Sequence, residues 1–553
     1  MIVFGSRSSE LALTQTRHVA ALLRARTGAE VRIEVLETTG DRVTERPLAA
    51  IGVKGAFTVE LEEALRAGRI AAAVHSLKDL PVDDPPDLVL GAIPERVDPT
   101  DVLLVAPHAH DPGAGALPLR HSARVGTSSP RRGLALQALR GDLRFLDIRG
   151  NVPTRVAKVR RGDYDAALFA AAGLDRLGLD LGDLRRVPVP IDLLPPAPGQ
   201  GALAVQCRRD DQATRALLAA IHDAGAARCV QAERDLLAAM GGGCSLPLGV
   251  LATAEPGGEF RLQAALFGGS PAVALRADQR GTDLPALVRT IAAPWAPLIG
   301  APLHGQRVLV LRPGGMGGDL AQSLAVAGAS VECVAWTRTE ELPPDRTALA
   351  AVCAAPALAF TSARAVERFA ALAPECRRAL AAARTFAVGA ATAAALRAAG
   401  ASPLVADGSG GSALAAHLAA ALPRGSAVGF PCALERHAGL ERDAAAAGLR
   451  VVPLPLYRTV ADPAAPDARG PADVVLLTSP SAVRAWLQRP RRPVVRHCVA
   501  IGPATAAAMR DAGLRVAAEA PRADLAPVVA ALRTCLPSAG PAPAAALHPY
   551  PKP

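Results

Sequence analysis

The feature that most constrains the fold of this chain is a short apolar run, Ile70 to Val74, that ends abruptly in polar residues. Five small apolar residues can form one buried strand and are too few for a helix. Four polar side chains follow at once: His75, Ser76, Lys78 and Asp79. Pro81 then stops any regular continuation. The pattern predicts a buried strand that carries a cation and a carboxylate at its carboxyl end.

Open α/β sheets place their ligand sites at the carboxyl ends of strands, so this position favours a functional site. The alternative is a surface ion pair between Lys78 and Asp79. The chain contains four lysines against 57 arginines, so it uses arginine almost wherever a cation is needed. A lysine kept at position 78 therefore indicates that a compact ammonium or a titratable amine is needed beside Asp79.

The residues around this strand predict an alternation of strands and helices. Ile2 to Gly5 is a predicted strand, followed by a helix with Ser8 as its N-cap. Val31 to Val35 alternates apolar and polar residues as a half-buried strand does. Phe57 to Ala67 is a predicted helix with acidic residues in its first turns. This β-α-β-α-β order predicts an α/β fold with a mainly parallel sheet.

Length and composition limit the classes of protein that remain. A chain of 553 residues, half of them hydrophobic, is long enough for three to five domains. The net charge of +10 comes without basic runs or a stacking platform, since aromatic residues are 3 % of the chain, so nucleic-acid binding is not expected. No apolar run reaches the length of about 20 residues that a membrane span needs, and no signal-peptide pattern opens the chain.

The cysteines favour a reducing compartment. The chain contains nine cysteines, an odd number, and no C-x-x-C pair. This spacing argues against both a disulfide framework and a zinc site, so we expect no metal and a cytoplasmic location.

The second half of the chain contains an internal repeat. LAFTSARAVERF at 358–369 matches VLLTSPSAVRAW at 475–486, and FAVGAATAAALRAAG at 386–400 matches VAIGPATAAAMRDAG at 499–513. Two further pairs, TRT with YRT at 337–339 and 457–459 and a strand start near 307 with one near 427, keep similar offsets. The repeat predicts two similar α/β subdomains with a cleft between them.

Three helix starts in the first half carry arginine, where the helix dipole disfavours a cation. Ser129 is a predicted N-cap with Pro130 at the first helical position, and two arginines follow in the first turn. The five arginines at these three starts are Arg7, Arg131, Arg132, Arg149 and Arg155. One such cation is easily explained as solvated, but three clusters at three strand-helix turns predict a small polyanionic ligand bound by guanidinium groups.

A last unusual feature is the loop GGGCSLPLG, which places Cys244 at a glycine-flanked tip. Most cysteines in such chains are buried and inert. No histidine nearby favours a Cys-His hydrolase.

The first half resembles the porphobilinogen deaminase (hydroxymethylbilane synthase) family. The resemblance rests on GSRSSELALTQ, KGAFTVELEEAL, AAVHSLKDLP, PERVDPTDVLL, VGTSSPRR, IRGNVPTR, AAAGLDRLG, PAPGQGALAV and ERDLLAAMGGGCSLPLG, in family order over residues 1 to about 250. The second half resembles uroporphyrinogen-III synthase through TSARAV, VGAATAAAL, YRT, TSPSAV and GPATAAA. The two activities are consecutive in tetrapyrrole synthesis, which extends to heme, so the chain resembles a bifunctional fusion.

The deaminase resemblance implies a fold and a role for each candidate residue. It implies two periplasmic-binding-protein-like α/β lobes and a small α+β domain that carries a dipyrromethane cofactor as a thioether on Cys244. Asp79 is the implied catalytic carboxylate. The implied cofactor-binding residues are Asp41, Lys78, Thr127, Ser129, Arg131, Arg132 and Arg155. The implied substrate-binding residues, for porphobilinogen, are Arg7, Ser76 and Arg149. Val59 and Gln206 depart from a lysine and a glutamate that are common in the family.

The synthase resemblance implies a two-subdomain α/β fold that closes hydroxymethylbilane to uroporphyrinogen III without a cofactor. Its implied cleft residues are Thr392, Tyr457, Ser479 and Thr505, although Ser479 and Thr505 are equally well explained as helix caps. The expected domains are 1–98 with 193–211, 99–192, 212–295, a linker at 296–305, 306–535 and a disordered tail at 536–553. We expect a monomer.

Two alternatives remain open from the sequence. The first half could be a two-lobed anion-binding protein, but such a protein needs neither Asp79 beside Lys78 nor an unpaired Cys244. The second half could be a non-catalytic structural or regulatory module that has kept the fold.

Overall fold

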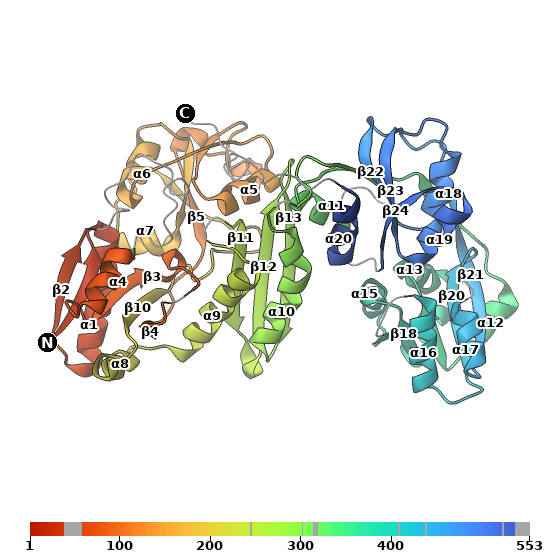
Figure 1. Ribbon diagram of the computed structural model, residues 1–553, viewed down its shortest axis with the longest axis horizontal. Coiled ribbons are helices and arrows are strands. Elements are labelled where there is room, and N and C mark those ends of the chain that lie inside the picture. The colour runs from red at the N-terminus through yellow and green to blue at the C-terminus, as the bar shows by residue number, and fades with distance from the viewer. Residues whose placement is uncertain are drawn as a thin grey trace. The chain divides into compact units, whose positions relative to one another are not determined.

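The computed structural model describes residues 1–37, 58–83, 85–243, 246–300, 302–312, 319–406, 410–436, 439–521 and 525–536. The chain forms two compact units (Figure 1). Unit 1 comprises Met1–Arg307, Gly317–Val331 and Asp524–Pro553, and unit 2 comprises Val308–Met316 and Glu332–Ala523. The motifs that predict a site around Asp79 all belong to unit 1.

The first sheet of unit 1 contains the strand predicted from the apolar run Ile70 to Val74. Its strands, in spatial order, are β2 (Val31–Leu36), β1 (Ile2–Arg7), β3 (Ala72–Ser76), β10 (Leu203–Arg208) and β4 (Leu88–Ala92). The first three strands are parallel, as the sequence predicts, whereas β10 is antiparallel to both of its neighbours. The prediction of a mainly parallel sheet is therefore correct for β2, β1 and β3 and wrong for the returning strand.

Each face of this sheet is covered by helices that the apolar pattern explains. Helix α1 (Glu10–Thr27) packs Val19 and Leu23 with Phe4 on one face, where α8 (Gln212–Ala219) also lies. Helix α4 (Val59–Arg66) covers the other face. Successive side chains of a strand point to opposite faces, so one set of β3 residues packs toward α1 and α8 and the other set toward α4.

The second sheet of unit 1 is built in the same way. Its strands, in spatial order, are β7 (Arg144–Leu146), β6 (Arg124–Gly126), β8 (Ala166–Ala170), β5 (Asp101–Val105) and β9 (Arg185–Pro188). Its helices are α5 (Pro130–Leu139), α6 (Val152–Arg160) and α7 (Ala171–Leu177). Ser129 caps α5, as predicted, by accepting the backbone N–H of Arg132 at 3.4 Å. Asn151 caps α6, so this helix begins before Pro153, the start predicted from the sequence.

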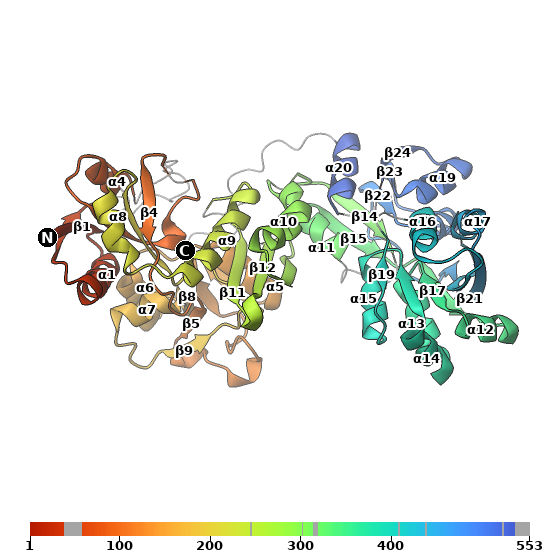
Figure 2. The same ribbon diagram turned by 90° about the horizontal axis from the view of Figure 1, so that it is seen from below.

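A third, three-stranded sheet completes the strands of unit 1. It consists of the antiparallel strands β11 (Leu248–Ala254), β12 (Phe260–Gly268) and β13 (Val273–Gly281). Helices α9 (Ala224–Ala239) and α10 (Leu284–Trp295) pack on this sheet (Figures 1 and 2). Ala265 and Phe267 of β12 instead join the apolar core around α5 and β8. The third sheet is thus packed into the second sheet's core.

Glu233 on α9 ties these segments together. Its carboxylate is fully buried and pairs with Arg96 at 2.6 and 3.1 Å. It also accepts the backbone N–H groups of Gly199 at 2.7 Å and Ala252 at 2.9 Å. One side chain therefore joins α9, β11 and the segment that leads into β10.

Two helices from distant parts of the sequence also belong to unit 1. They are α11 (Asp319–Val326) and α20 (Leu525–Cys535). Helix α11 packs against β13 and against the end of β12, where a Cβ on Gly268 would lie 3.2 Å from the Cα of Val326. Helix α20 packs against α10 and the short 3₁₀ helix Ala296–Leu298. A chain cut near residue 302 would lose both helices from unit 1.

Unit 2 contains two sheets whose strand orders correspond, except that the second has an additional edge strand, β16. One has the order β15 (Ser330–Val334), β14 (Arg307–Leu311), β22 (Ala472–Leu477), β23 (Val495–Ile501) and β24 (Val516–Ala520). The other has the order β16 (Thr337–Glu341), β21 (Arg450–Ala461), β20 (Ala427–Ala433), β17 (Ala357–Phe360), β18 (Arg384–Ala387) and β19 (Leu404–Val405). In the first sheet β15 and β14 lie beside β22, β23 and β24. In the second sheet β21 and β20 lie beside β17, β18 and β19.

The remaining helices of unit 2 follow the strands in the usual α/β manner. They are α12 (Arg346–Cys353), α13 (Ala363–Leu372), α14 (Pro374–Ala382), α15 (Ala390–Ala398), α16 (Gly411–Ala421), α17 (Gly439–Ala446), α18 (Pro480–Gln488) and α19 (Pro503–Asp511). The TRT and YRT segments pair with each other, since β16 runs antiparallel to β21 with Thr339 opposite Thr459.

Two local predictions need correction. Ser9, one residue after the predicted Ser8, caps α1 by accepting the backbone N–H of Ala12 at 3.3 Å. The predicted Phe57–Ala67 helix is observed as Val59–Arg66, and Phe57 lies outside the described residues.

Replacing Glu233 tests the fold of unit 1. Glu233→Gln keeps the shape but removes the charge that Arg96 needs, so we expect the free energy of unfolding to fall by about 3 kcal/mol or more. Hydrogen exchange of the Gly199 and Ala252 amides in the full chain should accelerate, because both donate to this carboxylate. Glu259→Gln, at an exposed position, is the matched control. Unchanged exchange at both amides would contradict the assigned role.

Candidate active site

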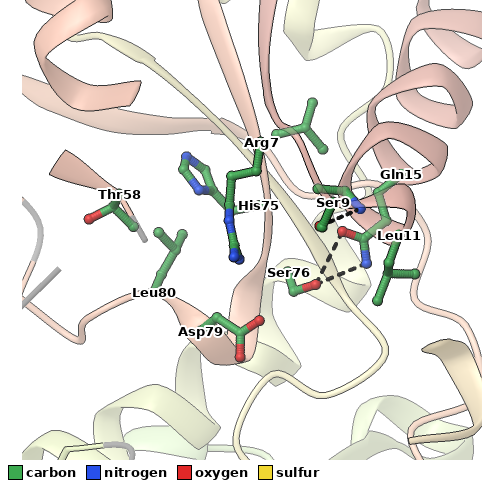
Figure 3. Close-up of a pocket in the computed structure, with 11 residues that line it drawn as sticks. Arg7, Ser9, Leu11, Gln15, Thr58, His75, Ser76, Asp79 and Leu80 are labelled. Atoms are coloured by element: carbon green, nitrogen blue, oxygen red, sulfur yellow. Dashed lines mark hydrogen bonds between the residues drawn. The ribbon is translucent and has the colours of Figure 1, made fainter. Parts of the chain in front are cut away.

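The carboxyl end of β3 opens into a cavity, as the sequence predicts. A 3₁₀ helix, Leu77–Asp79, follows the strand and turns Asp79 outward, where its side chain is exposed. The cavity is lined by Arg7, Ser9, Leu11, Ala12, Gln15, Thr58, Val74, His75, Ser76, Asp79 and Leu80. Figure 3 shows the guanidinium of Arg7 pointing toward Ser76 and Asp79. The structure therefore brings together three predicted site residues, Arg7, Ser76 and Asp79.

The cavity wall on the α1 side is fixed by hydrogen bonds. The Nε2 of Gln15 donates to the Ser76 hydroxyl at 2.9 Å, and this hydroxyl lies 3.2 Å from Oε1 of the same amide (Figure 3). Gln15 is buried, so the pair joins α1 to the end of β3. Ser76 is consequently held in place before any ligand arrives.

Behind Asp79 lies a buried charge cluster centred on Asp101, at the start of β5. Its carboxylate accepts hydrogen bonds from Arg131 at 2.7 Å, from Arg132 at 2.6 and 3.0 Å and from Nε2 of Gln200 at 3.0 Å. Asp101 is fully buried, and both arginines are more than nine-tenths buried. The Oε1 of Gln200 in turn accepts from Nζ of Lys78 at 3.3 Å.

This finding changes the interpretation of two predicted arginines. The sequence offered two readings for the cations at the start of α5: solvated side chains or ligands of an anion. Arg131 and Arg132 instead pair first with a carboxylate of the protein itself. A guanidinium has five N–H groups, and the hydrogen bonds of Arg131 to Asp101 and to the carbonyl of Pro195 use two of them. Both side chains can therefore be fixed by Asp101 and still offer donors to a ligand.

The cluster perturbs its own titrations. Burial alone would raise the pKa of Asp101, but the charges of Arg131 and Arg132 outweigh it and hold the pKa at about 2. Burial lowers the pKa of Lys78 to about 8, while the charge of Asp79 acts in the opposite direction. Lys78 is thus the titratable amine that the rarity of lysine predicts.

Arg155, in the first turn of α6, lies in the same electrostatic environment. Its guanidinium stands 5.0 Å from the centre of the Phe169 ring, and its Nε is buried without a hydrogen-bond partner. Burial lowers its pKa to about 10, and the charge of Arg132 adds to this effect. A buried donor without a partner is costly unless a ligand supplies an acceptor.

The site carries more positive than negative charge. The cations Lys78, Arg131, Arg132 and Arg155 interact with two carboxylates, those of Asp79 and Asp101, which leaves a surplus of two positive charges. Desolvated charges of one sign are unfavourable unless opposite charge compensates them. The donor set therefore fits a ligand that bears several carboxylates.

The other predicted residues have structural partners. Thr127 is buried and accepts the backbone N–H of Ser129 at 3.2 Å, while Ser129 caps α5. Arg149 donates to Asp147 at 2.8 Å and stays half exposed. Asp41 and Cys244 lie outside the described residues.

Sequence reasoning missed four residues of this site: Gln15, His75, Asp101 and Gln200. Gln15, Asp101 and Gln200 stand in stretches that carry the family resemblance, ELALTQ, DPTDVLL and PGQGAL, and His75 directly follows the apolar run. The sequence therefore draws attention to these positions, but the site residues that they contact are far away in sequence.

In unit 2, one predicted residue finds a partner that the repeat marks. The hydroxyl of Tyr457 lies 2.8 Å from that of Ser362, and burial raises the pKa of Tyr457. Ser362 occupies the position in TSARAV that Ser479 occupies in TSPSAV. Both serines cap helices, α13 and α18, whereas Thr392 and Thr505 are buried inside α15 and α19. The capping explanation is thus correct for Ser479 and wrong for Thr505.

The described part of the chain contains neither a candidate metal site nor a candidate membrane-spanning helix. Its His, Cys, Asp and Glu side chains form no group of three that could hold a metal ion. None of its helices is long and apolar enough to cross a membrane.

Comparison with known proteins gives family-model matches for both parts of the chain. Residues 2–216 match the family model described as porphobilinogen deaminase, dipyrromethane cofactor binding domain, and residues 227–271 match the C-terminal domain of that family. Residues 318–530 match the model of uroporphyrinogen-III synthase.

Individual proteins also resemble parts of the chain. A porphobilinogen deaminase of Roseiflexus sp. (strain RS-1) is 48 % identical over 282 residues, which are 51 % of this chain and 90 % of the relative. A porphobilinogen deaminase of Xanthomonas euvesicatoria is 47 % identical over 291 residues, 52 % of this chain and 93 % of the relative. A uroporphyrinogen III synthase structure from Thermus thermophilus covers 41 % of this chain and 96 % of its own, at 23 % identity and a TM-score of 0.28.

The titration of Lys78 is measurable because lysine is rare. Reductive methylation with ¹³C-formaldehyde of the Cys244→Ser chain should give one dimethyl-lysine signal that titrates near pH 8. Because folding lowers this pKa, the contribution of Lys78 to the free energy of unfolding should increase as the pH rises through about 8. Lys78→Arg should remove the signal. If every lysine signal titrates above pH 10, the ammonium is well hydrated and the cluster is not as described.

Proposed function

The chain belongs to the porphobilinogen deaminase family, and from this premise we propose that it carries out two consecutive reactions of tetrapyrrole synthesis. Unit 1 joins four porphobilinogen molecules into hydroxymethylbilane with release of ammonia. The segment that matches uroporphyrinogen-III synthase then closes this product to uroporphyrinogen III. The observation that carries the proposal for unit 1 is the surplus of cations beside Asp79, of which Arg131 and Arg132 are buried and Lys78 and Arg155 are half-buried.

The donor set of unit 1 suits the covalent dipyrromethane of the family. Lys78, Arg131, Arg132 and Arg155 would hold its acetate and propionate groups, with the Ser129 and Thr127 turn beside them. The partnerless Nε of Arg155 supports this assignment. We assign its thioether attachment to Cys244 and a further contact to Asp41, both outside the described residues. When bound, the group supplies the free pyrrole carbon to which the first substrate is joined.

Asp79 is the proposed catalytic carboxylate. Porphobilinogen loses its amine as ammonia when the C–N bond of its aminomethyl group breaks, and positive charge develops on the pyrrole nitrogen. A carboxylate can accept the pyrrole N–H and stabilise that charge. The 3₁₀ turn presents Asp79 at the cavity, so its exposure is what this role requires.

Arg7, Ser76 and Arg149 are proposed to bind the incoming substrate. Ser76 is oriented by Gln15. Arg149 rests on Asp147, and its half-exposed guanidinium can exchange that carboxylate for one of the substrate at little cost, since surface ion pairs are weak. Four additions accumulate carboxylates in one site, and this explains why so many guanidinium groups surround it.

The synthase reaction requires orientation of a flexible polyanion more than acid-base catalysis. Apart from the edge strand β16, the corresponding strand orders of the two sheets support an internal repeat in which each copy gives two strands to one sheet and three to the other. We place the substrate between these two subdomains, against Tyr457, Ser479, Thr392 and Thr505. We propose no cofactor for this half.

Two wider expectations remain part of the proposal. We expect a cytoplasmic monomer, and we keep the domain limits expected from the sequence for the deaminase lobes. A second half without catalytic activity is the alternative for residues 306–535. The match of residues 318–530 to the synthase family favours the active form.

The intact mass of the full chain tests the deaminase proposal. We expect an excess of one dipyrromethane unit over the sequence mass, and Cys244→Ser should lose both this excess and porphobilinogen turnover. Asp79→Asn is the matched variant, because it should keep the added mass and lose at least about 10²-fold in turnover. A Cys244→Ser chain with full mass and activity would refute the attachment site.

Isomer analysis tests the synthase proposal. Hydroxymethylbilane closes spontaneously to the type I isomer, so an active second half must compete and give type III. The full chain supplied with porphobilinogen should therefore produce mainly uroporphyrinogen III. Phe360→Asp, which places a charge in the fully buried core of β17, should unfold that sheet and shift the product to type I.

The control for this experiment is the rate of porphobilinogen use, which Phe360→Asp should leave unchanged. Point variants of the full chain are preferable to truncation, because α11 and α20 belong to unit 1. If the full chain also gives type I, the second half is a structural or regulatory module.

A further inference from the structure

One buried amide in unit 1 joins the charge cluster around Asp101 to the lysine beside Asp79. Gln200 lies in the turn before β10 and is 1 % exposed. Its Nε2 donates to the backbone carbonyl of Pro99 at 2.7 Å and to Oδ1 of Asp101 at 3.0 Å. Its Oε1 accepts from Nζ of Lys78 at 3.3 Å. The two ends of one amide thus contact a carboxylate and an ammonium.

These partners determine which way round the amide of Gln200 lies. A carbonyl and a carboxylate only accept hydrogen bonds, whereas an ammonium only donates them. The reversed amide would bring its oxygen against two acceptors and its NH₂ group against the ammonium. The observed orientation satisfies all three partners, so the oxygen of the amide is directed to Lys78.

The main chain at Gln200 is fixed as well. Its N–H donates to the carbonyl of Ala197 at 2.9 Å, and its carbonyl accepts from Nε of Arg96 at 2.9 Å. Arg96 is in turn paired with the buried carboxylate of Glu233. The amide therefore belongs to a well-connected part of unit 1, and it can fix the long side chain of Lys78 rather than follow it.

An amide at this place has a different effect on the lysine from a carboxylate. The amide oxygen accepts one of the three N–H groups of an ammonium and brings no net charge. A carboxylate would pair with Lys78 and cancel its charge, and it would stand beside Asp101, which repels it. Glutamine can therefore hold the ammonium while its positive charge continues to act on its surroundings.

The charged groups that face Lys78 come from three elements. They are Asp79 of its own turn, Asp101 of β5, and Arg131 and Arg132 of α5. Burial lowers the pKa of Lys78 to about 8, the two carboxylates oppose this effect and the two arginines add to it. A hydrogen bond to the ammonium form raises the pKa of an amine, so the amide of Gln200 acts in the same direction as the carboxylates.

We propose that Gln200 is a positioning residue, which holds the ammonium of Lys78 in one place without neutralising it, so that its charge acts on a carboxylate of the ligand. This inference rests on the proposed deaminase function, in which Lys78 binds the dipyrromethane. Gln200 acts through Lys78 and takes no proton in the reaction.

The titration of Lys78 measures this role in the absence of any ligand. In the Cys244→Ser chain labelled with ¹³C-lysine, Gln200→Met should move the titration of Lys78 to lower pH by about one unit, because the ammonium loses an acceptor. Gln212→Met, at the exposed first residue of α8, is the matched control and should leave the titration in place. An unmoved titration in the folded Gln200→Met chain would overturn the proposal.

A second measurement covers the case in which Gln200→Met fails to fold. In the Cys244→Ser chain labelled with ¹⁵N-glutamine, the side-chain amide signal of Gln200 should shift with the same midpoint as Lys78, and Lys78→Met should abolish the shift. The amide of Gln231, which donates to Asp235 on the exposed side of α9, should not respond. If no glutamine amide follows the titration of Lys78, the proposal is wrong.

Turnover of the full chain connects the role to the proposed function. Gln200→Met should lower the rate of porphobilinogen use at least about tenfold, the size expected when a hydrogen bond to a charged group is lost, and Gln212→Met should not. Unchanged turnover in the folded Gln200→Met chain would also overturn the role of Gln200. A wild-type chain that neither carries the added mass nor consumes porphobilinogen would overturn the proposed function, and the ligand-free titrations would still decide whether Gln200 holds Lys78.

Discussion

The geometry of the site in unit 1 depends on one buried carboxylate, that of Asp101. It accepts hydrogen bonds from two guanidinium groups of α5 and from Gln200, and so joins β5, α5 and the segment before β10. Burying such charges costs more than their attraction returns unless every partner is present. Here they are present, since Arg131 also donates to Pro195 and Arg132 to Leu168. The arrangement holds three chain segments in one geometry because loss of any partner leaves a charge buried alone.

The same carboxylate sets the electrostatics of the cavity beside it. Asp101 neutralises one of the two arginines that it holds, so the other remains as net positive charge next to Lys78 and Arg155. The excess positive charge of such a site is unfavourable without a bound anion, and a ligand with several carboxylates would compensate it. Cation pairing inside the protein and the proposed binding of an anion therefore depend on one cluster.

The sequence predicted the strand that delivers Asp79, the cap at Ser129 and the alternation of strands and helices, because these depend on neighbours within a few residues. It did not predict that Arg131 and Arg132 pair with Asp101, since that carboxylate is about 30 residues away and reaches them only through the sheet. The helix-dipole argument correctly marked the arginines as anomalous. It could not tell whether the compensating anion is a ligand or a side chain, and the structure shows the side chain of Asp101 in this place.

His75 shows the same limit from another side. Its place directly after an apolar run is readable from the sequence, but its burial in the wall of the cavity is a property of the surrounding packing. Gln15 is comparable, since its pairing with Ser76 spans 61 residues. In both cases the residue type is visible and its use is decided by tertiary contacts.

The compact units and the family matches divide the chain differently, and the difference has a physical consequence. The synthase match covers residues 318–530, yet α11 and most of α20 within that range pack in unit 1. Leu298 is almost fully buried in a 3₁₀ helix that packs against α20. Unit 1 therefore cannot complete its apolar core until the last helix has been synthesised. Contacts between residues so distant in sequence are slow to form, because the loop between them must close first. The intervening segment thus has time to fold before unit 1 is finished, and the stability of the deaminase half depends on residues that follow the synthase strands.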